Sequence, residues 1–222
     1  WRITFVKYKC TFLCFFHYIS IMSEFYINDK QEDEKKGNSP DVFAEKFIKT
    51  RQILLSGEIN KDLAEKFNKQ LLLLEADNND PVYVYIDSPG GDVSAGFAIY
   101  DMIRFVSCPV VLVGNGLIAS AAALILLAVP KERRVGFPNS EYLIHQPLSQ
   151  MEGTASDILI HAENLTKTKA KINKIISEAS GKDLDKVKKD TERDCWLNAE
   201  EAKEYGLISK IVTTRDELKS IK

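Results

Sequence analysis

One serine of this chain stands where acyl-transfer chemistry could take place. Ser120 follows a short β-branched run at 110–113 and opens an apolar run, 120–129, that ends at Pro130. The pattern predicts a buried strand that leads into a core helix. A hydroxyl at such a junction could attack a carbonyl carbon, with free amide hydrogens and the helix dipole stabilising the oxyanion. The same pattern is also typical of a serine that only caps a helix.

A serine nucleophile needs a base, and the chain contains three histidines. His17 lies in an unusual N-terminal stretch, and His161 lies inside a predicted helix, where a structural role is the default. His145 ends a predicted strand at 141–144, immediately before a Gln-Pro break. Histidine side chains generally titrate near pH 6.5, which suits proton transfer at neutral pH. His145 is therefore the best placed base, although a structural histidine at a strand end is an equal alternative.

Spacing alone does not select the acid that would orient this histidine. Several aspartates lie near predicted ends of elements, and most of them must be caps or solvated charges: Asp87, Asp92, Asp101, Asp157, Asp190 and Asp194. Cys195 could act as a nucleophile, but a lone cysteine is more often a small buried hydrophobe. No group of His, Cys, Asp or Glu has the spacing of metal ligands.

Strands and helices alternate along the chain around these groups. The expected strands are 52–56, 82–86, 110–113, 135–137, 141–144 and 207–212. The expected helices are 61–76, 94–105, 120–129, 156–179, 183–189 and 199–204, with Asn60 and Asn198 as N-terminal caps of the first and the last and Gly181 as the stop of the helix at 156–179. This alternation predicts an α/β sheet with right-handed crossovers. The segment 151–155 is expected to be extended, and the charged tail from Arg215 is expected to fray.

The turn Asp87-Ser-Pro-Gly-Gly91 joins a strand to a helix. Its two glycines let the backbone approach a ligand or another chain closely, although a tight turn is the commoner reason for such a pair. A phosphate-binding loop is disfavoured, because the Lys-Ser/Thr ending of that motif is missing.

Composition narrows the class of protein. With 222 residues, 45% of them hydrophobic, the chain can bury a sizeable core as one domain. Thirty Lys and Arg against 32 Asp and Glu give a net charge of −2 without a basic block, so nucleic acid is not expected as a partner. The four cysteines form neither a C-x-x-C pair nor a Cys/His cluster, which fits a reducing compartment.

Two N-terminal segments are expected to lie outside the fold. Residues 1–22 begin with Trp1 and combine a basic start with an apolar run too short for a membrane span. They are either a targeting leader or translated upstream sequence, and we favour the second because Met22-Ser-Glu resembles an ordinary start. Residues 23–41 are polar and charged, which predicts a mobile arm.

Several motifs, in order along residues 51–212, resemble the ClpP family of Clp serine proteases. They are Tyr85-Ile-Asp-Ser-Pro-Gly-Gly91, Ser94-Ala-Gly-Phe-Ala-Ile-Tyr-Asp101, Ala119-Ser120, Pro138-Asn-Ser-Glu-Tyr-Leu-Ile-His-Gln-Pro147, Asp190-Thr-Glu-Arg-Asp194 and Glu200-Glu-Ala-Lys-Glu-Tyr-Gly206. The resemblance implies an α/β, crotonase-like (ClpP) fold at 42–212, with a protruding strand-helix handle at about 150–179. Residues 23–41 would then be similar to an axial gate, and 213–222 would form a charged tail.

The resemblance also implies roles for individual residues. Ser120 would be the nucleophile, His145 the general base and Asp194 its orienting acid, while the backbone N–H groups of Gly91 and Ala121 would form the oxyanion hole. The implied activity is that of an ATP-dependent Clp protease proteolytic subunit, a serine endopeptidase. No cofactor or metal is implied for this chain, because the partner unfoldase uses the ATP.

The implied assembly is two stacked heptameric rings that enclose a chamber. A hexameric AAA+ unfoldase such as ClpX or ClpA would thread unfolded polypeptides into it, and a ClpP paralogue could join the rings. We expect a cytoplasmic location and neither a nucleic-acid nor a membrane partner. An organellar location would follow if residues 1–22 are a genuine targeting segment.

The sequence departs from the family's pattern at three places. It has Ile118-Ala-Ser-Ala-Ala122 where Ala-Ala-Ser-Met-Gly is usual, which puts the packing near the nucleophile in question. Asp87 replaces the usual Asn, with no consequence that the sequence reveals, and the arm before Asp41 lacks the expected apolar start. Two alternatives follow: a weakly active subunit that scaffolds an active paralogue, and a crotonase-fold enzyme acting on an acyl thioester.

Overall fold

The structure is a computed structural model, and it describes residues 46–221 of the chain. The predicted leader at 1–22 and the predicted arm at 23–41 lie outside the described residues. Among those described, no helix combines the length and the apolar composition needed to cross a bilayer.

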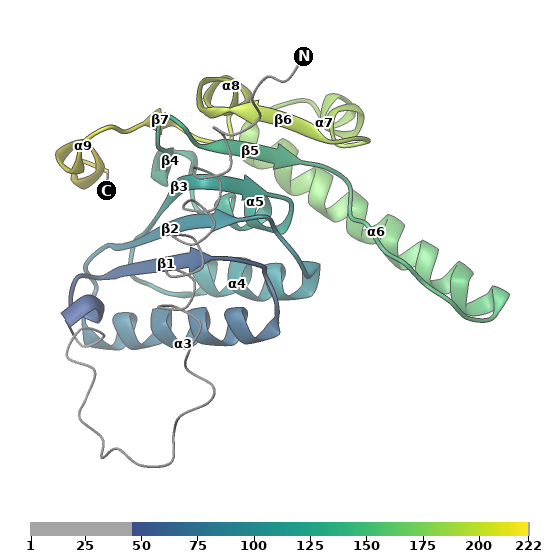
Figure 1. The fold of residues 1–222 in the computed structure, drawn as a ribbon, viewed down its shortest axis with the longest axis horizontal. Coiled ribbons are helices and arrows are strands. Elements are labelled where there is room, and N and C mark those ends of the chain that lie inside the picture. Colours follow the sequence, from purple (N-terminus) through teal and green to yellow (C-terminus); the bar gives the residue numbers. More distant parts are fainter. Residues whose placement is uncertain (1–45, 222) are drawn as a thin grey trace, which may run out of the picture. The chain divides into compact units, whose positions relative to one another are not determined.

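A single sheet organises the described residues, with strand order β1-β2-β3-β4-β7 and with β5 and β6 continuing from the far half of β3 (Figure 1). The strands are β1 (Gln52–Ser56), β2 (Val82–Ser88), β3 (Val110–Ala119), β4 (Arg134–Gly136), β5 (Glu141–Ile144), β6 (Cys195–Asn198) and β7 (Lys210–Ile211). Neighbouring strands are parallel except for the antiparallel pair β5 and β6. The predicted α/β sheet is confirmed.

The helices connect these strands, and all of those described except α5 and the 3-10 turn η1 begin at a side-chain cap. They are α3 (Lys61–Asp77), α4 (Val93–Phe105), α5 (Ala121–Leu126), the short 3-10 turn η1 (Lys131–Arg133), α6 (Ala155–Ser180), α7 (Leu184–Asp190), α8 (Ala199–Tyr205) and α9 (Arg215–Lys219). The Asn60 side chain accepts a hydrogen bond from Leu63 N at the start of α3, as predicted. Asn198 and Glu201 form a reciprocal capping box on α8.

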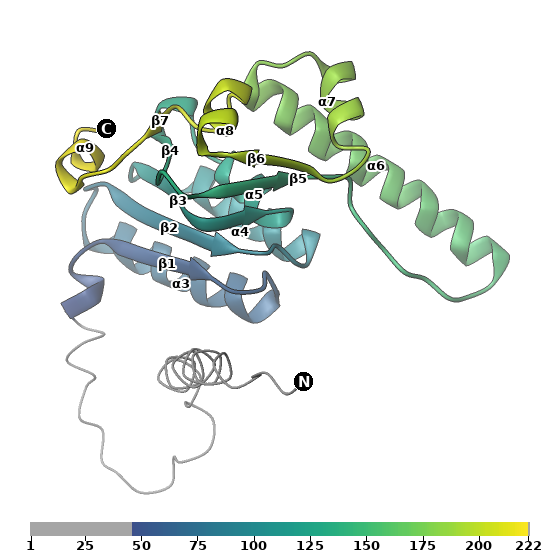
Figure 2. The same cartoon turned by 45° about the horizontal axis from the view of Figure 1, so that its top comes forward.

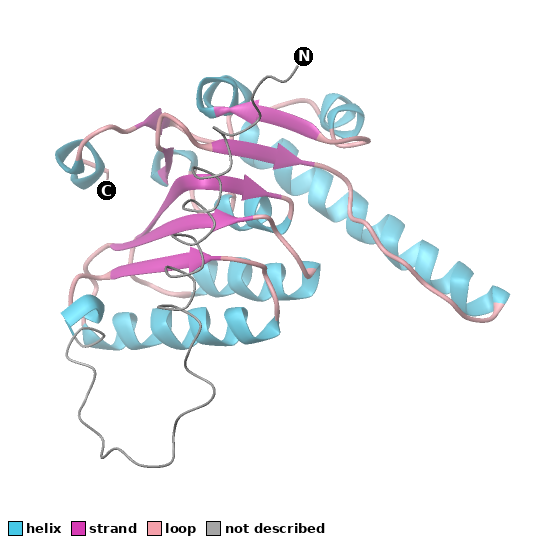
Figure 3. Cartoon of the chain, in the orientation of Figure 1, coloured by secondary structure: helices cyan, strands magenta, loops and turns pink. Residues whose placement is uncertain are grey.

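The main core lies between the sheet and helices α3, α4 and α5, which cover one face of β1, β2 and β3 (Figure 3). Leu55, Ile86 and Leu112 come from the strands, and Ile99 and Ile125 from the helices; each of these side chains is fully buried. Burying one such side chain stabilises a fold by roughly 1.5–3 kcal/mol. This layer therefore fixes the strand ends that carry the site.

The C-terminal tail was predicted to fray, but in the structure it forms helix α9. Thr214 caps α9 by accepting from Glu217 N, and Leu218, 5% exposed, packs with Val111, Val113 and other residues of the second face of the sheet. The prediction that this segment frays was wrong because it weighed the charges of the segment and missed its apolar contacts, which Leu218 and the partly buried Ile221 supply.

The boundaries around Ser120 also differ from the prediction. β3 continues to Ala119 instead of ending at Val113, and α5 covers only Ala121–Leu126 instead of 120–129. Glycines at 114 and 116 looked like the end of a strand, but the chain resumes pairing beyond them, with β5. The final strand is likewise only Lys210–Ile211.

Helix α6 runs well beyond the sheet, and the connection that precedes it lies alongside it (Figure 2). Residues 145–154 form neither helix nor strand, so the extended segment predicted at 151–155 contains no strand. Ser149 Oγ lies 2.6 Å from Nε2 of His161, which ties this connection to α6. Gly181, in the left-handed conformation, ends the helix as the sequence indicated.

Candidate active site

Strand pairing brings Ser120, His145 and Asp194 to one edge of the sheet. Ala119 pairs with Leu143 across β3 and β5, and Ser120 N donates to Leu143 O at 2.9 Å. Ser120 and His145 follow the last paired residues of β3 and β5. Asp194 precedes Cys195, the first residue of β6, which pairs with Ile144 at the end of β5. Three adjacent strands thus deliver a hydroxyl, an imidazole and a carboxylate to the same place.

Ser120 has a strained backbone. Its φ of 56° and ψ of −118° are rare for a residue with a side chain, and such conformations cost about 1–3 kcal/mol. Its hydroxyl makes no capping hydrogen bond to α5. The interpretation of Ser120 as an ordinary helix cap is therefore wrong. A serine held on a tight strand-to-helix turn, with a hydroxyl that does not bond to the helix, suits a nucleophile.

Of the two histidines in the described part of the chain, His145 is the one that approaches a carboxylate. Its Nδ1 lies 3.7 Å from Asp194 Oδ1, and its side chain is only 13% exposed, whereas that of Asp194 is 65% exposed. This separation is longer than a hydrogen bond, which is common in catalytic groups before substrate binds. Of the several aspartates that the sequence left open, Asp194 is the one that pairs with His145.

Three of the other candidate aspartates have separate structural roles. Asp92 caps α4 by accepting from Ala95 N, and Asp157 accepts a hydrogen bond from Thr154 Oγ1 in the first turn of α6. Asp190 accepts a hydrogen bond from the Tyr205 hydroxyl at 2.8 Å. Burial, with this hydrogen bond as a second cause, raises the pKa of Tyr205. Burial raises the pKa of the Cys195 thiol, which disfavours the thiolate that a nucleophile requires.

Gln146 holds the loop that carries Asp194. Its backbone N donates to Thr191 O at 2.7 Å, and its side-chain Nε2 donates to Glu192 O at 2.8 Å. Because Gln146 follows His145 directly, these two bonds fix the base and the acid-bearing loop relative to each other.

Helix α6 supports the same loop from the other side. The Thr191 hydroxyl lies 2.9 Å from Asn173 Oδ1, and both residues are buried. Lys169 Nζ lies 2.7 Å from a Glu192 carboxylate oxygen, and this hydrogen bond lowers the pKa of Glu192. The position of Asp194 therefore depends on how α6 packs.

The candidate oxyanion hole is formed by backbone that meets at Ser120. A Cβ atom built on Gly90 would lie 2.7 Å from Ser120 Cβ and 3.0 Å from Ala121 N, so the Gly90–Gly91 peptide is packed against the serine. Ile59 forms a parallel β-bridge with Gly91, in which Ile59 N donates to Gly90 O and Asp92 N donates to Ile59 O. Within the described residues the N–H groups of Gly91 and Ala121 make no hydrogen bond, so both remain available as donors.

Sequence reasoning missed Gln146, Asn173 and Thr191. A signal for Asn173 was present, since an amide between the apolar positions Ile172 and Ile176 of one helix is a buried polar group that needs a partner. Nothing in the sequence pointed to Thr191 as that partner.

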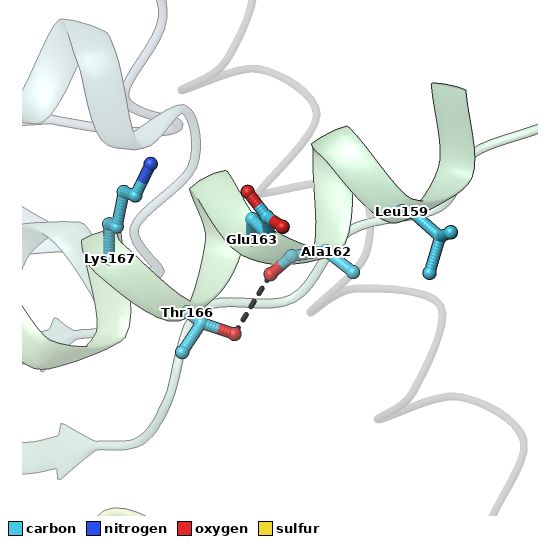
Figure 4. Close-up of a pocket in the computed structure, with 5 residues that line it drawn as sticks. All are labelled: Leu159, Ala162, Glu163, Thr166 and Lys167. Carbon is cyan, nitrogen blue, oxygen red and sulfur yellow. Dashed lines mark hydrogen bonds between the residues drawn. The ribbon is translucent and has the colours of Figure 1, made fainter. Parts of the chain in front are cut away.

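A hollow of about 450 Å³ lies on α6 (Figure 4). It is lined by Leu159, Ala162, Glu163, Thr166 and Lys167, none of which belongs to the group at the strand ends. In the described part of the chain, no set of three or more His, Cys, Asp or Glu side chains is arranged to hold a metal ion.

Comparisons with known proteins agree on one family. The sequence model of the family described as Clp protease matches residues 34–215. The ATP-dependent Clp protease proteolytic subunit 2 of Treponema denticola is 58% identical over 87% of this chain and 98% of its own length. Subunit 3 of Rhizobium etli is 44% identical over 86% of this chain and all of its own. A mutant ClpP1 from Listeria monocytogenes has a similar structure, with a TM-score of 0.75, 45% identity, and coverage of 80% of this chain and 99% of its own.

Proposed function

This chain belongs to the Clp protease family and is a serine-type endopeptidase, and we propose that Ser120, His145 and Asp194 are its catalytic triad. One observation carries the assignment of the residues: the pairing of β3, β5 and β6 brings these three side chains to adjacent strand ends, with His145 Nδ1 3.7 Å from Asp194 Oδ1.

In the proposed reaction, Ser120 Oγ attacks the peptide carbonyl carbon while His145 takes the hydroxyl proton. His145 then gives that proton to the leaving amine, which leaves an acyl group on Ser120. A water molecule, activated by the same histidine, hydrolyses the acyl-enzyme. Asp194 keeps the imidazole in the right tautomer and stabilises its protonated form.

The oxyanion would be bound by the N–H groups of Gly91 and Ala121. Removing one such donor typically costs about 3–4 kcal/mol of transition-state stabilisation. Ala121 replaces a usual methionine, but a backbone donor does not depend on the side chain. Its Cβ fits closely against α4, since a Cβ on Gly96 would lie 3.2 Å from it.

We propose that the chain works as an oligomer with a Clp ATPase, as two stacked heptameric rings served by a hexameric AAA+ unfoldase such as ClpX or ClpA. The handle at 150–179 would contact the opposite ring. Ile158, Leu159 and Ile160 on α6 are 45%, 66% and 58% exposed, an unusual density of apolar surface that such a contact would bury. Cofactors are not required by this chemistry, because the partner hydrolyses the ATP.

The remaining assignments of the chain are part of the same proposal. The protease domain would cover residues 42–212, 213–222 would be a C-terminal segment, and the location would be cytoplasmic. The relatives are named as proteolytic subunits, which favours peptide hydrolysis over thioester chemistry and over a purely scaffolding role.

A fluorophosphonate probe tests the assignment directly. The assembled protein should be labelled at Ser120, as located by peptide mapping, and Ser120→Ala should not be labelled. Native mass measurement before labelling establishes whether rings have formed. Absence of labelling in assembled protein, or equal labelling of Ser120→Ala, would rule out Ser120 as the nucleophile.

A further inference from the structure

β3 changes partner strands between its two halves, and a bulge lies at the point of change. Leu112, Val113 and Gly114 pair with β4, whereas Leu117, Ile118 and Ala119 pair with β5. On the other side, Ile86 of β2 pairs with Gly114 but Ser88 pairs with Ile118. Asp87 alone therefore faces the three β3 residues between Gly114 and Ile118, which is an irregularity of the kind that bends a strand and redirects it.

The Asp87 carboxylate fills this irregularity. Its Oδ1 accepts a hydrogen bond from Leu117 N at 3.0 Å, a ladder donor that the bulge has separated from any backbone acceptor on β2. Gly116 sits under the same oxygen with φ of +91°, and a Cβ there would lie 2.8 Å from Oδ1. The carboxylate therefore replaces a missing strand partner, and the glycine makes room for it.

The main chain of Asp87 is held as well. Its carbonyl oxygen accepts from Gly57 N at 3.0 Å, and it pairs with Ser56 across β1 and β2. The acceptor thus stands on a fixed strand. The chain continues from Asp87 through Ser88 into the turn that contains Gly90, which is packed against Ser120.

We propose that Asp87 is a positioning residue for the reaction: its Oδ1 holds the bulge of β3 in the form that delivers Ser120 to the ends of β5 and β6. Leu117 is three residues before Ser120, and Ile118 and Ala119 between them pair with β5. A shift of the bulge at Leu117 would therefore be passed along this short paired segment to the nucleophile. The inference rests on the proposed role of Ser120. It assigns the acceptor oxygen of Asp87, not its charge, as the property that matters.

Three substitutions of Asp87 distinguish the effect of its hydrogen-bond acceptor from the effect of its negative charge. Asp87→Asn keeps an oxygen in the same place without the charge. Asp87→Glu keeps the charge but displaces the oxygen by one methylene, and Asp87→Ala removes both. Asp101→Ala, at an exposed site on α4, is the matched control. Each protein is assayed, as assembled rings, for the rate of fluorophosphonate labelling and for kcat and KM on a short fluorogenic peptide, with Tm and native mass recorded.

We expect labelling and kcat to fall about tenfold in Asp87→Ala and Asp87→Glu with KM within about twofold, because small misplacements of reacting groups carry costs of that order. Asp87→Asn and Asp101→Ala should stay within about twofold of the parent. Parent-like labelling of Asp87→Ala, an Asn variant as slow as the Ala variant, or losses that occur only where the ring mass is lost would each overturn the inference. Failure of the parent protein to label at Ser120 would instead overturn the proposed function.

Discussion

His145 Nδ1 lies 3.7 Å from Asp194 Oδ1, although 49 residues separate them in the chain numbering, because β5 and β6 pair antiparallel up to Ile144 and Cys195. In a single chain the carboxylate is largely exposed to water, so the ion pair by itself contributes little to stability. Its value is in orienting the imidazole. Changes to the His145–Asp194 pair should therefore affect activity rather than folding.

Asp194→Asn should lower kcat about 10⁴-fold with little change in Tm, because an amide favours the wrong imidazole tautomer in a triad. Peptide cleavage by the assembled protein measures this, with Asp101→Asn as a control that should behave like the parent. A fall of less than tenfold would remove Asp194 from the triad.

Gly90→Ala should abolish labelling of Ser120. The added methyl group would lie 2.7 Å from both Ser120 Cβ and Ala119 O, on backbone with φ of +92°. Gly181→Ala is the matched control, because it also has a positive φ, +74°, but nothing lies within 4 Å of its added methyl group. It should lose about 1–2 kcal/mol of stability from backbone strain and keep its labelling rate. Equal labelling of the two variants would show that Gly90 does not pack against the nucleophile.

Thr191→Val should lower both the stability and the activity. The substitution keeps the shape but leaves the buried Asn173 Oδ1 without the Thr191 hydroxyl, at a cost of about 1–3 kcal/mol. Because Thr191 belongs to the loop that carries Asp194, kcat should also fall. Thr166→Val is the control: its hydroxyl bonds Ala162 O on an exposed face of α6 (Figure 4), and its loss should change stability by less than about 0.5 kcal/mol. Thermal and urea unfolding beside peptide cleavage measure both effects, and a parent-like Thr191→Val protein would contradict the coupling.

Tyr142 should make stability depend on pH in the alkaline range. Burial raises the pKa of Tyr142 to about 12 from its ordinary value of 10.0, since the ring is fully buried. The hydrogen bond that its hydroxyl accepts from Ser140 Oγ at 2.9 Å acts against this rise and is outweighed by burial. A raised pKa in the folded state means that the neutral form is favoured there. Its stabilising contribution is complete below pH 10 and is lost as the pH rises towards 12.

Comparison with Tyr142→Phe isolates this effect from other tyrosines. The free energy of unfolding of the parent, minus that of the variant, should decrease by about 2 kcal/mol between pH 10 and 12, most of the roughly 2.7 kcal/mol that corresponds to two pKa units. A difference that stays constant with pH would mean that Tyr142 ionises freely in the folded protein.

Much of the fold was predictable because its determinants are local. Periodicity and caps at Asn60 and Asn198 placed α3 and α8, and Gly181 placed the end of α6. The errors arose where a distant segment decides the outcome. β3 continues through its glycines because β5 pairs with it, and the C-terminal segment orders because Leu218 finds an apolar face of the sheet.

The sequence by itself determined the chemical groups, Ser120 and His145, and through the family motifs it indicated Asp194 and the glycine turn. Only the tertiary structure showed that the Ser120 backbone is strained and that its hydroxyl does not cap α5. It also showed which of several aspartates lies beside His145, and that Asp87 accepts a hydrogen bond from the bulge of β3. The physical reason is that residue types and short spacings specify which groups are present. Strand register, which brings residues far apart in the chain to one edge, depends on pairing and burial across the whole sheet.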